Sequence, residues 1–512
     1  MTRFARIGRN VSLNYAGALI GGTVFVLLTP FVVRELGEVG FGIWVLIHTI
    51  VFYLNFLELG FDAALVKYVA EYSAAGRDDD VQAVVNTSLG SFVAAGVLAL
   101  LASCAIALFL VPAAFEVPDD MVRVMQICLL ILGIELLFSF PGSVFDGILE
   151  GRQRYDILNY TGIAFTLAGA AGTVLVLLGG FGLVGLALME LGLSLLGIVI
   201  DWLIVRRLLP RLSFHPGAWS AAAWRKIRGF SLWSSLTDLL TEGSAHLDKL
   251  LIPVVLSVSL LTPYALICSV AALIFIAVEP LSEVFFPMAA ELDGRADRKA
   301  LRRLLVQGTK LVLAISLPVA IAVFFFGRQI IGLWIGAEYF DVSILVLHFV
   351  VLNFLMSAFL WTSLAVLSGL GLVRRIFVFS VLELVLVVGL IVLTVPRFGL
   401  TGLAASSMAA NVLIGFALFI PAACRATGLP LWRLLSSGLA RPLLPAVPSA
   451  WLAHTLLDSA PPDTWLALGM DCIAVVAVYG AGFLLLSLSA GERAFYFERI
   501  RELLRRREAP AA

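Results

Sequence analysis

Charged side chains are scarce in this sequence. Asp, Glu, Lys and Arg together make up 14% of its 512 residues, whereas about 25% is usual in soluble domains. The 35 basic and 35 acidic residues cancel, so no net positive field exists to attract nucleic acid. The five cysteines lie far apart, with no CxxC pair, which excludes a disulfide scaffold and a cysteine-ligated zinc site. A nucleotide-binding motif is also missing, so neither ATP hydrolysis nor any cofactor is expected.

Apolar residues, in contrast, are abundant. They account for 61% of the chain, and there are 44 glycines besides. A soluble protein of this size could not hide so much apolar surface, because its exterior needs enough polar groups to face water. The sequence therefore predicts an all-α polytopic membrane protein, and no loop is long enough to form a folded aqueous domain.

The apolar stretches are long enough to cross a bilayer, which takes about 20 residues in a helix. About fourteen transmembrane helices are predicted, and the thirteenth is the shortest and contains three prolines. Their ranges are 13–33, 40–59, 84–111, 122–147, 158–178, 183–205, 231–256, 263–287, 305–326, 343–367, 376–395, 399–420, 442–457 and 466–489.

Basic residues alternate between two sets of connections. With the N-terminus placed inside, the inner connections and the adjoining helix ends hold 30 of the 35 Lys and Arg residues, and the outer ones hold four. Lys249 alone lies deep within a predicted span. Cytoplasmic loops of membrane proteins carry such an excess of basic residues. The pattern therefore predicts that both termini are cytoplasmic and that the number of spans is even.

Short sequence matches recur at nearly constant spacing. GFGLVGLAL at 180–188 matches RFGLTGLAA at 397–405, a spacing of 217. TPFVV around Pro30 matches IPVVL around Pro253 at a spacing of 223, and Glu71 in VAEY matches Glu291 in AAEL at a spacing of 220. Because these matches keep chain order, we expect helices 1–6 and 7–12 to be duplicated bundles.

Six is an even number, so both bundles enter the membrane from the same side and form a parallel repeat around a central cavity. Transporters built in this way bind substrate between the halves and alternate access by rocking one against the other. The predicted organisation is an N-terminal six-helix bundle (1–205), a cytoplasmic inter-bundle linker (206–230), a C-terminal six-helix bundle (231–425), extra helices 13 and 14 (426–489) and a basic cytoplasmic tail (490–512).

Four stretches resemble the bacterial oligosaccharide flippases of the O-antigen type, within the multidrug/oligosaccharidyl-lipid/polysaccharide exporter superfamily. They are GEVGFGIWVLIHTIVFYLNFLELGFDAALVKYVAE (37–71), EGRQRYDILNY (150–160), the FG-x-x-GLA turn (181–187) and DKLLIPVVLSVSLLTPYAL (248–266). The resemblance covers about residues 1–425. The lipid II flippases are less similar, because the arginine-rich pattern near their first helices is missing here.

The resemblance implies a transporter and not an enzyme. Such a flippase moves an undecaprenyl-pyrophosphate-linked oligosaccharide from the inner to the outer leaflet of the bacterial inner membrane, for surface polysaccharide biosynthesis. The expected partners are this lipid-linked oligosaccharide, membrane lipids and a coupling proton or sodium ion, and a monomer is expected.

Two alternative functions stay open. One is a cation-coupled small-molecule (multidrug-type) exporter of the same fold, and the other is a membrane polymerase or ligase, although no outer loop is large enough to carry catalytic residues.

The predicted helix 231–256 carries an unusual group of ionisable residues. Each such group at mid-membrane costs about 2.5–3.5 kcal/mol on insertion scales, so it normally faces a cavity or a partner. We therefore expect a substrate or coupling-ion cavity lined by Asp238, Glu242, His246, Asp248 and Lys249, several of which share one helix face. The alternative is a network of inter-helix ion pairs. Because most of these residues are acidic, the sequence favours a neutral or weakly charged sugar unit, or else leaves an anionic charge to the arginines at the cytoplasmic mouth.

Two further groups are expected at the cytoplasmic mouth of the cavity. The acidic pairs Glu58/Asp62 and Glu279/Glu283 both have i,i+4 spacing and match each other at an offset within the range of the repeat, although they can equally be ordinary interfacial carboxylates. The candidate pyrophosphate contacts are Lys67, Arg152, Arg154, Arg374 and Arg375, because a pyrophosphate needs such donors. The general excess of basic residues in cytoplasmic loops explains these lysine and arginine residues equally well.

The remaining ionisable residues within the spans are assigned no site. His48 and His348 are expected to be packing residues, and Glu190 is expected to be a contact between helices.

Overall fold

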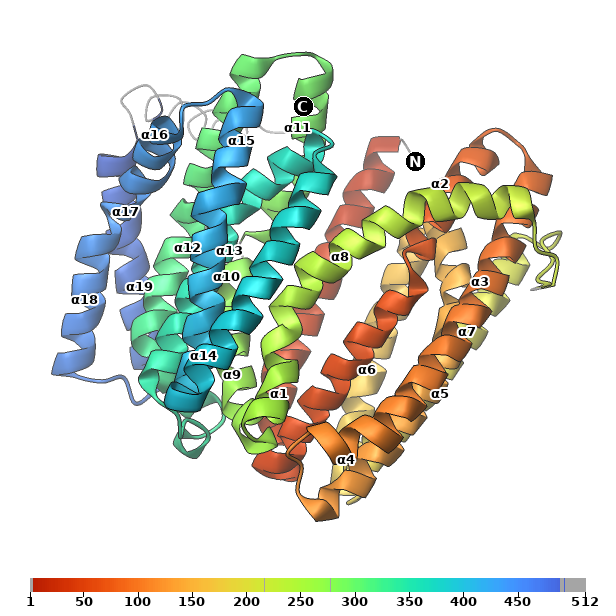
Figure 1. The fold of residues 1–512 in the computed structure, drawn as a ribbon, viewed down its shortest axis with the longest axis horizontal. Helices are drawn as coiled ribbons and strands as arrows, with labels where there is room; N and C mark the ends of the chain where they lie inside the picture. Colours follow the sequence, from red (N-terminus) through yellow and green to blue (C-terminus); the bar gives the residue numbers. More distant parts are fainter. Residues whose placement is uncertain (1–2, 216, 277, 489–491, 493–512) are drawn as a thin grey trace, which may run out of the picture. The chain divides into compact units, whose positions relative to one another are not determined.

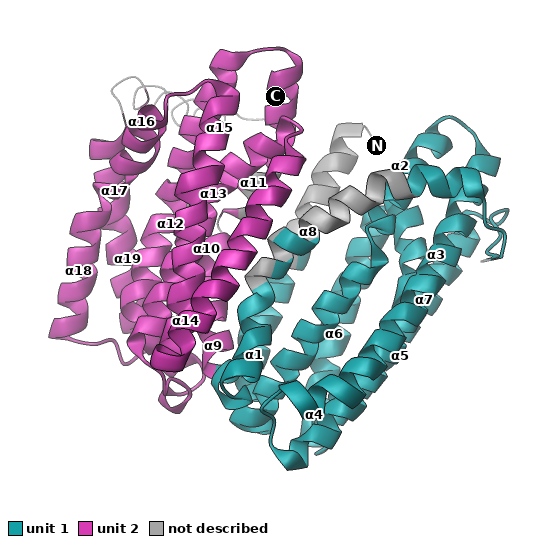
Figure 2. Cartoon of the chain, viewed as in Figure 1, with its two compact units in different colours: residues 1–262 teal, residues 263–512 magenta. Residues whose placement is uncertain are grey.

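The computed structural model describes residues 3–215, 217–276, 278–488 and 492, without the side chains of residues 3–16, 18, 228–238, 241, 242, 244, 245, 279, 280, 282 and 283. Every regular element in this described part is a helix, as expected for a chain whose backbone polar groups must pair within a bilayer. The contacts divide the chain into two compact units, residues 1–262 and 263–512 (Figure 2).

Unit 1 is a bundle of long helices (Figure 1). Helices α3, α5 and α7 pack side by side, α2 covers α3 and α5, and α6 packs against α1 and α7. The elements are α1 (Arg3–Asn55), η1 (Phe56–Glu58), α2 (Phe61–Ala74), α3 (Asp78–Ala105), η2 (Ile106–Leu110), α4 (Val111–Ala114), α5 (Asp119–Gly151), α6 (Tyr155–Leu178), α7 (Gly182–Leu208), α8 (Ala221–Val255) and η3 (Val258–Leu260).

Helix α1 consists of two helices that meet at Gly37. This residue has φ 70° and ψ 176°, a conformation that glycine adopts without the strain a Cβ would bring. The two halves correspond to the spans predicted at 13–33 and 40–59. Charged residues flank the break at Arg34 and Glu38, because a connection at the membrane surface tolerates charges that the apolar spans do not.

The connection between α7 and α8 is shorter than the linker predicted at 206–230, because α8 already begins at Ala221. Side chains of α3 hold this connection. Asn86 Oδ1 accepts a hydrogen bond from the main-chain N–H of His215, and Thr87 Oγ1 accepts one from that of Ser220, both at 3.1 Å. Helix α8 then packs against α1, α2 and α3. Along the chain, the boundary between the two compact units falls between residues 262 and 263 and not in the predicted linker. The predicted division into bundles at residues 205 and 231 therefore stays a prediction.

Unit 2 is also a helical bundle. Helices α12, α13 and α14 pack in series, and α11 covers α12 and α13. The elements are α9 (Leu261–Ala271), which straddles the unit boundary, α10 (Leu273–Ile276), α11 (Glu279–Gly294), α12 (Arg298–Trp334), η4 (Ala337–Tyr339), α13 (Ile344–Gly369), α14 (Val373–Ile414), η5 (Gly415–Phe419), α15 (Ile420–Thr427), α16 (Leu431–Arg433), η6 (Leu434–Ala440), α17 (Arg441–Leu443), α18 (Ala446–Ser459), α19 (Trp465–Gly482) and η7 (Phe483–Ser487).

The span predicted at 263–287 is not one continuous helix. Helix α9 ends at Ala271, α10 is a single turn, and α11 begins at Glu279. Pro280 lies in the first turn of α11, where its missing N–H has no intrahelical partner to lose. The prediction of one helix is therefore wrong, because an apolar composition indicates a length of chain in the membrane but not its continuity.

Helix α14 is interrupted at Gly399, which has φ 53° and ψ −134°. The two parts correspond to the spans predicted at 376–395 and 399–420. At the equivalent place in unit 1, by the sequence match between 180–188 and 397–405, Gly182 begins α7 with φ 57°. The FG-x-x-GLA match in the sequence thus coincides with a positive φ at the matching glycine of each unit.

Other helix ends recur at nearly the same spacing. Helix α3 begins at Asp78 and its counterpart α12 begins at Arg298. Helix α6 begins at Tyr155 and its counterpart α14 begins at Val373. Both offsets fall within the range given by the short sequence matches. These recurrences are compatible with the predicted parallel repeat, which stays a prediction.

The two helices that follow the predicted repeat, α18 and α19, pack against α12. The hydroxyl of Tyr479 in α19 donates a hydrogen bond to the main-chain oxygen of Pro442 at 3.1 Å. Lys310 in α12 is only 5% exposed, and its Nζ lies 2.9 Å from Oε2 of Glu492. The C-terminal part of the chain therefore contributes to the interior of unit 2.

Ten helical segments among the described residues are long and apolar enough to cross a membrane, so the chain is a multi-pass membrane protein. Two of these segments, Leu19–Glu58 and Val373–Thr427, each contain two predicted spans, which separate at Gly37 and Gly399. The other two predicted spans coincide with α8 and with the region of α18. The structure is thus compatible with fourteen spans, and that number stays a prediction.

Candidate functional site

Unit 1 contains a cavity of about 420 Å³ between the two halves of α1 and the C-terminal part of α8. We call it the aromatic cavity. Its lining residues are Phe25, Leu28, Thr29, Val32, Phe41, Trp44, Val45, His48, Thr49, Phe52, His246 and Lys249. A concave and mostly apolar pocket with a few polar groups is the usual form of a site for a small molecule or a head group.

The second half of α1 supplies most of the wall. Phe41, Trp44, His48 and Phe52 follow one another at intervals of three or four residues, which places them on one face of the helix. The Trp44 and His48 rings meet edge to face, with 4.4 Å between their centroids. Aromatic rings in this arrangement give a large and rigid contact surface.

Helix α8 supplies the basic side of the aromatic cavity. The His246 ring lies 4.2 Å from the Phe52 ring, centroid to centroid, and Lys249 follows one turn later. The Tyr53 hydroxyl donates a 2.6 Å hydrogen bond to the main-chain oxygen of Gly243, which ties α8 to α1 at this level. The structure thus brings two of the predicted cavity residues, His246 and Lys249, into one site.

The other predicted residues of this helix differ in position. Asp248 is 8% exposed and is not part of the described lining. The side chains of Asp238 and Glu242 lie outside the described part of the chain, so their place in a cavity stays a prediction. The lining that is described therefore carries one full charge, the ammonium of Lys249, where the sequence suggested an acidic surface.

His48 lines the aromatic cavity, although sequence reasoning assigned it to packing. Its Nε2 lies 3.5 Å from Oε1 of Glu190 in α7, a carboxylate placed to orient the imidazole and to pair with its protonated form. The pairing joins two residues that are distant in sequence and lie on different helices, which the sequence could not reveal. The regular spacing of Trp44, His48 and Phe52 was the available signal for a shared face.

The acidic pair Glu58/Asp62 lies on either side of the break between η1 and α2. Oε1 of Glu58 is buried and has no hydrogen-bond partner among the described residues. Asp62 interacts electrostatically with Glu58, and also with Asp146 and Glu150 of α5, and burial raises the pKa of its carboxyl. The pair therefore belongs to a larger acidic group in unit 1, which sequence spacing alone did not connect.

The equivalent pair in unit 2 cannot be compared at the level of side chains. Glu279 and Glu283 both lie in α11, but their side chains are outside the described part of the chain. Their role at a cytoplasmic mouth therefore stays a prediction.

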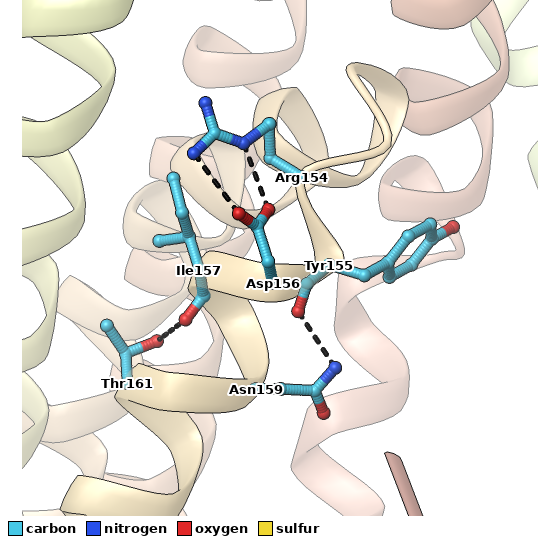
Figure 3. A network of polar contacts seen from close by, with 6 residues as sticks. All are labelled: Arg154, Tyr155, Asp156, Ile157, Asn159 and Thr161. Atoms are coloured by element: carbon cyan, nitrogen blue, oxygen red, sulfur yellow. Dashed lines mark hydrogen bonds and ion pairs between the residues drawn. The ribbon is translucent and has the colours of Figure 1, made fainter. Parts of the chain in front are cut away.

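The candidate pyrophosphate contacts of unit 1 have different surroundings. Arg154 pairs with Asp156, with Nε 3.0 Å from Oδ1, in the polar network that begins α6 (Figure 3). Lys67 is exposed and lies over the Tyr68 ring at 5.1 Å, and Arg152 is exposed in the turn after α5. The charge of Arg154 is thus partly neutralised, while Arg152 faces solvent.

The two candidates in unit 2 lie side by side at the start of α14. Arg374 and Arg375 are both exposed. Arg375 also lines a second cavity, which is formed entirely by unit 2. The structure therefore gives Arg375 a defined binding environment, which the sequence did not.

Comparisons with known proteins agree with this architecture. A curated relative, "Uncharacterized membrane protein EpsK" of Bacillus subtilis (strain 168), is 22% identical over 96% of this chain and 98% of its own length. The "Putative O-antigen transporter" of Shigella flexneri is 21% identical over 78% of this chain and 93% of its own length.

Solved structures show the same fold at low identity. The lipid II flippase MurJ in an inward closed conformation matches with a TM-score of 0.66 and 15% identity, over 93% of this chain and 98% of that chain. An inward-facing multidrug resistance MATE transporter of the MOP superfamily matches with a TM-score of 0.65 and 15% identity, over 81% of this chain and 96% of that chain.

The model of the polysaccharide biosynthesis protein family matches residues 31–344. These residues include every lining residue of the aromatic cavity except Phe25, Leu28 and Thr29. The chain therefore belongs to the family of polysaccharide biosynthesis proteins.

Proposed function

We propose that this protein is a flippase that moves undecaprenyl-pyrophosphate-linked oligosaccharide units across the bacterial inner membrane, for surface polysaccharide biosynthesis. It works by alternating access and has both termini in the cytoplasm. The family membership and the transporters among its relatives support the class. The alternation of basic residues between the two sets of connections supports the orientation.

The observation that carries the proposal is the composition of the aromatic cavity. Trp44 and Phe52 offer flat apolar faces, and sugar rings present apolar C–H faces that pack against such surfaces. His48 and His246 add hydrogen-bonding groups, and Lys249 adds one cation. A site with these groups fits a neutral or weakly charged oligosaccharide whose anionic end needs a cationic contact.

The position of Lys249 also argues for transport. Keeping a lysine within a membrane helix costs about 2.5–3.5 kcal/mol on insertion scales, and this cost is avoided when the ammonium reaches a hydrated cavity. Lys249 does line a cavity. Coupling to a proton or sodium ion further needs a carboxylate that changes partner between the two access states, and Glu242 remains our candidate for that role.

The decisive experiment is depletion of the protein in its native host. Lipid-linked repeat units are expected to accumulate on the cytoplasmic leaflet, because their synthesis continues while translocation stops. The leaflet is identified by the access of an impermeant glycosidase to spheroplasts and to inverted vesicles. Unchanged surface polysaccharide in a host without a second flippase would refute the proposal. Export of cationic dyes would then be measured to test the multidrug-type alternative.

A further inference from the structure

Unit 2 has a cavity of its own, of about 680 Å³, where four segments meet. We call it the arginine cavity. It is formed by the end of α11, the start of α12, the turn and first residues of α14, and the η5–α15 region. Figure 1 shows α11 and α15 at the same end of unit 2. Its basic residues, Arg298, Arg375 and Arg425, all fall in connections predicted to be cytoplasmic.

The three arginine side chains of the arginine cavity differ in their contacts. Arg298 NH1 lies 3.4 Å from Oδ1 of Asp293 and donates a 3.2 Å hydrogen bond to the main-chain oxygen of Ala426, so it holds α15 against α12. Arg375 and Arg425 are exposed and make no ion pair with another described residue. The cavity therefore presents two arginines whose guanidinium groups are available to an anion, and its lining contains one carboxylate, which Arg298 already engages.

The wall between these arginines is apolar. Phe379 and Leu418 line the arginine cavity, together with several leucine and alanine side chains. A free anion would find little to contact on such a surface. The combination of guanidinium groups and an apolar wall fits a molecule with an anionic head and an apolar body.

An exposed apolar stripe leads away from the cavity along α14. Val378, Leu382, Val385 and Val392 are all exposed, the last two by 65% and 67%. They share one side of the helix with Arg375, because their spacing keeps them within about 100° of it. From Arg375 to Val392 the helix rises by about 25 Å, close to the thickness of the hydrocarbon core. The stripe thus offers a path for a long lipid chain whose head lies at Arg375.

From this arrangement we infer that the arginine cavity binds the phosphate-bearing head of a lipid in the cytoplasmic leaflet, with Arg375 and Arg425 as its donors and the α14 stripe as the track for its chain. Arginine suits this role, because its planar group donates paired hydrogen bonds to phosphate oxygens. Two lipids share the chemistry, a polyprenyl pyrophosphate and an ordinary anionic phospholipid. The inference does not require transport, so it stands or falls apart from the proposed function.

The test measures lipid binding to the purified full-length protein in detergent. The probe is radiolabelled undecaprenyl pyrophosphate, and the variant is Arg375→Gln/Arg425→Gln, which keeps polar side chains but removes both charges. The matched control is Arg433→Gln, because Arg433 is equally exposed and predicted to be cytoplasmic but does not line the cavity. Arg298 is left intact because it supports the fold. We expect the double variant to bind at least about tenfold more weakly, since two charge-assisted contacts are lost, and the control to bind like the wild type.

Competition identifies the lipid. Displacement of the probe by phosphatidylglycerol as effectively as by unlabelled undecaprenyl pyrophosphate assigns the site to anionic phospholipid, and displacement by the polyprenyl lipid alone assigns it to the carrier. Geranyl pyrophosphate is expected to compete weakly, because its chain is too short for the α14 stripe. Equal binding by wild type and double variant would overturn the inference. Equal competition by inorganic pyrophosphate would also overturn it, because the site would then recognise a free anion. If binding is lost while flipping persists, the site is separate from transport.

Discussion

The ring of His246 in α8 lies 4.2 Å from the ring of Phe52 in α1, centroid to centroid. His246 comes from the helix that sequence analysis singled out for its ionisable groups, and Phe52 comes from a predicted span whose apolar middle carried no candidate site residue. Their contact forms one wall of the aromatic cavity beside Lys249. The candidate site is therefore a basic edge on an aromatic surface, which neither helix provides alone.

The positive φ angles of Gly182, at the start of α7, and of Gly399, within α14, make a prediction about stability. Gly399→Ala is expected to lower the free energy of unfolding by about 1–3 kcal/mol, because an L-residue is strained at positive φ. Nothing lies within 4 Å of a Cβ at either position, so the loss comes from the backbone alone. Gly389→Ala is the matched control, since Gly389 lies in the same helix α14, has similar free space and has no positive φ.

The measurement is the thermal midpoint of each purified variant in detergent, followed by size-exclusion chromatography. Gly389→Ala is expected to leave the midpoint unchanged or raise it, because alanine is the better helix former by about 0.5–1 kcal/mol. Gly182→Ala should resemble Gly399→Ala. A Gly399→Ala protein as stable as the Gly389→Ala control would contradict the role of backbone strain at the break.

The ion pair of Lys310 with Glu492 makes a second prediction. Glu492→Gln leaves a buried ammonium without its carboxylate, and we expect a loss of about 1–3 kcal/mol in stability, reduced from the fully buried case because Glu492 is 25% exposed. Lys310→Met/Glu492→Gln should recover most of this loss, because it removes both charged partners. The measurement is a double-mutant cycle, which compares the thermal midpoints of the wild type, Lys310→Met, Glu492→Gln and the double variant. Additive losses would show that the two residues do not depend on each other.

Orientation in the membrane is the third prediction. Reporter fusions after Pro118, Gly336 and Asp463 are expected to report the periplasm, because the adjoining connections carry few basic residues. A fusion after Arg211, in the basic α7–α8 connection, is the cytoplasmic control. A cytoplasmic signal from any of the first three sites, in a fusion of normal abundance, would break the predicted alternation.

The sequence predicts helix ends where a local signal marks them. Glycines bounded by charged residues marked the break at Gly37, and the FG-x-x-GLA motif marked Gly399. The interruption after Ala271 had no comparable signal, because apolar residues continue on both sides of it, and Glu279 and Pro280 come only where α11 begins. Periodicity and composition report the local environment of a helix, so they miss an interruption that tertiary packing stabilises.

The candidate sites depend on contacts that are distant in sequence. Lys249 could be singled out because a lysine in an apolar helix is costly. The pairing of His48 with Glu190 could not, since each residue alone is typical of a helix contact. The arginine cavity was only partly anticipated through Arg375, because its other basic residues come from helices that begin or end elsewhere in the chain.

The last prediction separates transport from structure at Lys249. Lys249→Ala removes the one full charge of the described lining of the aromatic cavity, and we expect polysaccharide export to fall at least tenfold at normal membrane abundance, because the anionic end of the substrate loses its cationic contact. Lys249→Arg, which keeps the charge, should retain more activity. Arg225→Gln, in the exposed first turns of the same helix, is the matched control and should export normally. A structural ion-pair role predicts a different result, in which Lys249→Ala lowers abundance and thermal stability as much as export. Full export by a well-expressed Lys249→Ala protein would remove this residue from the transport site.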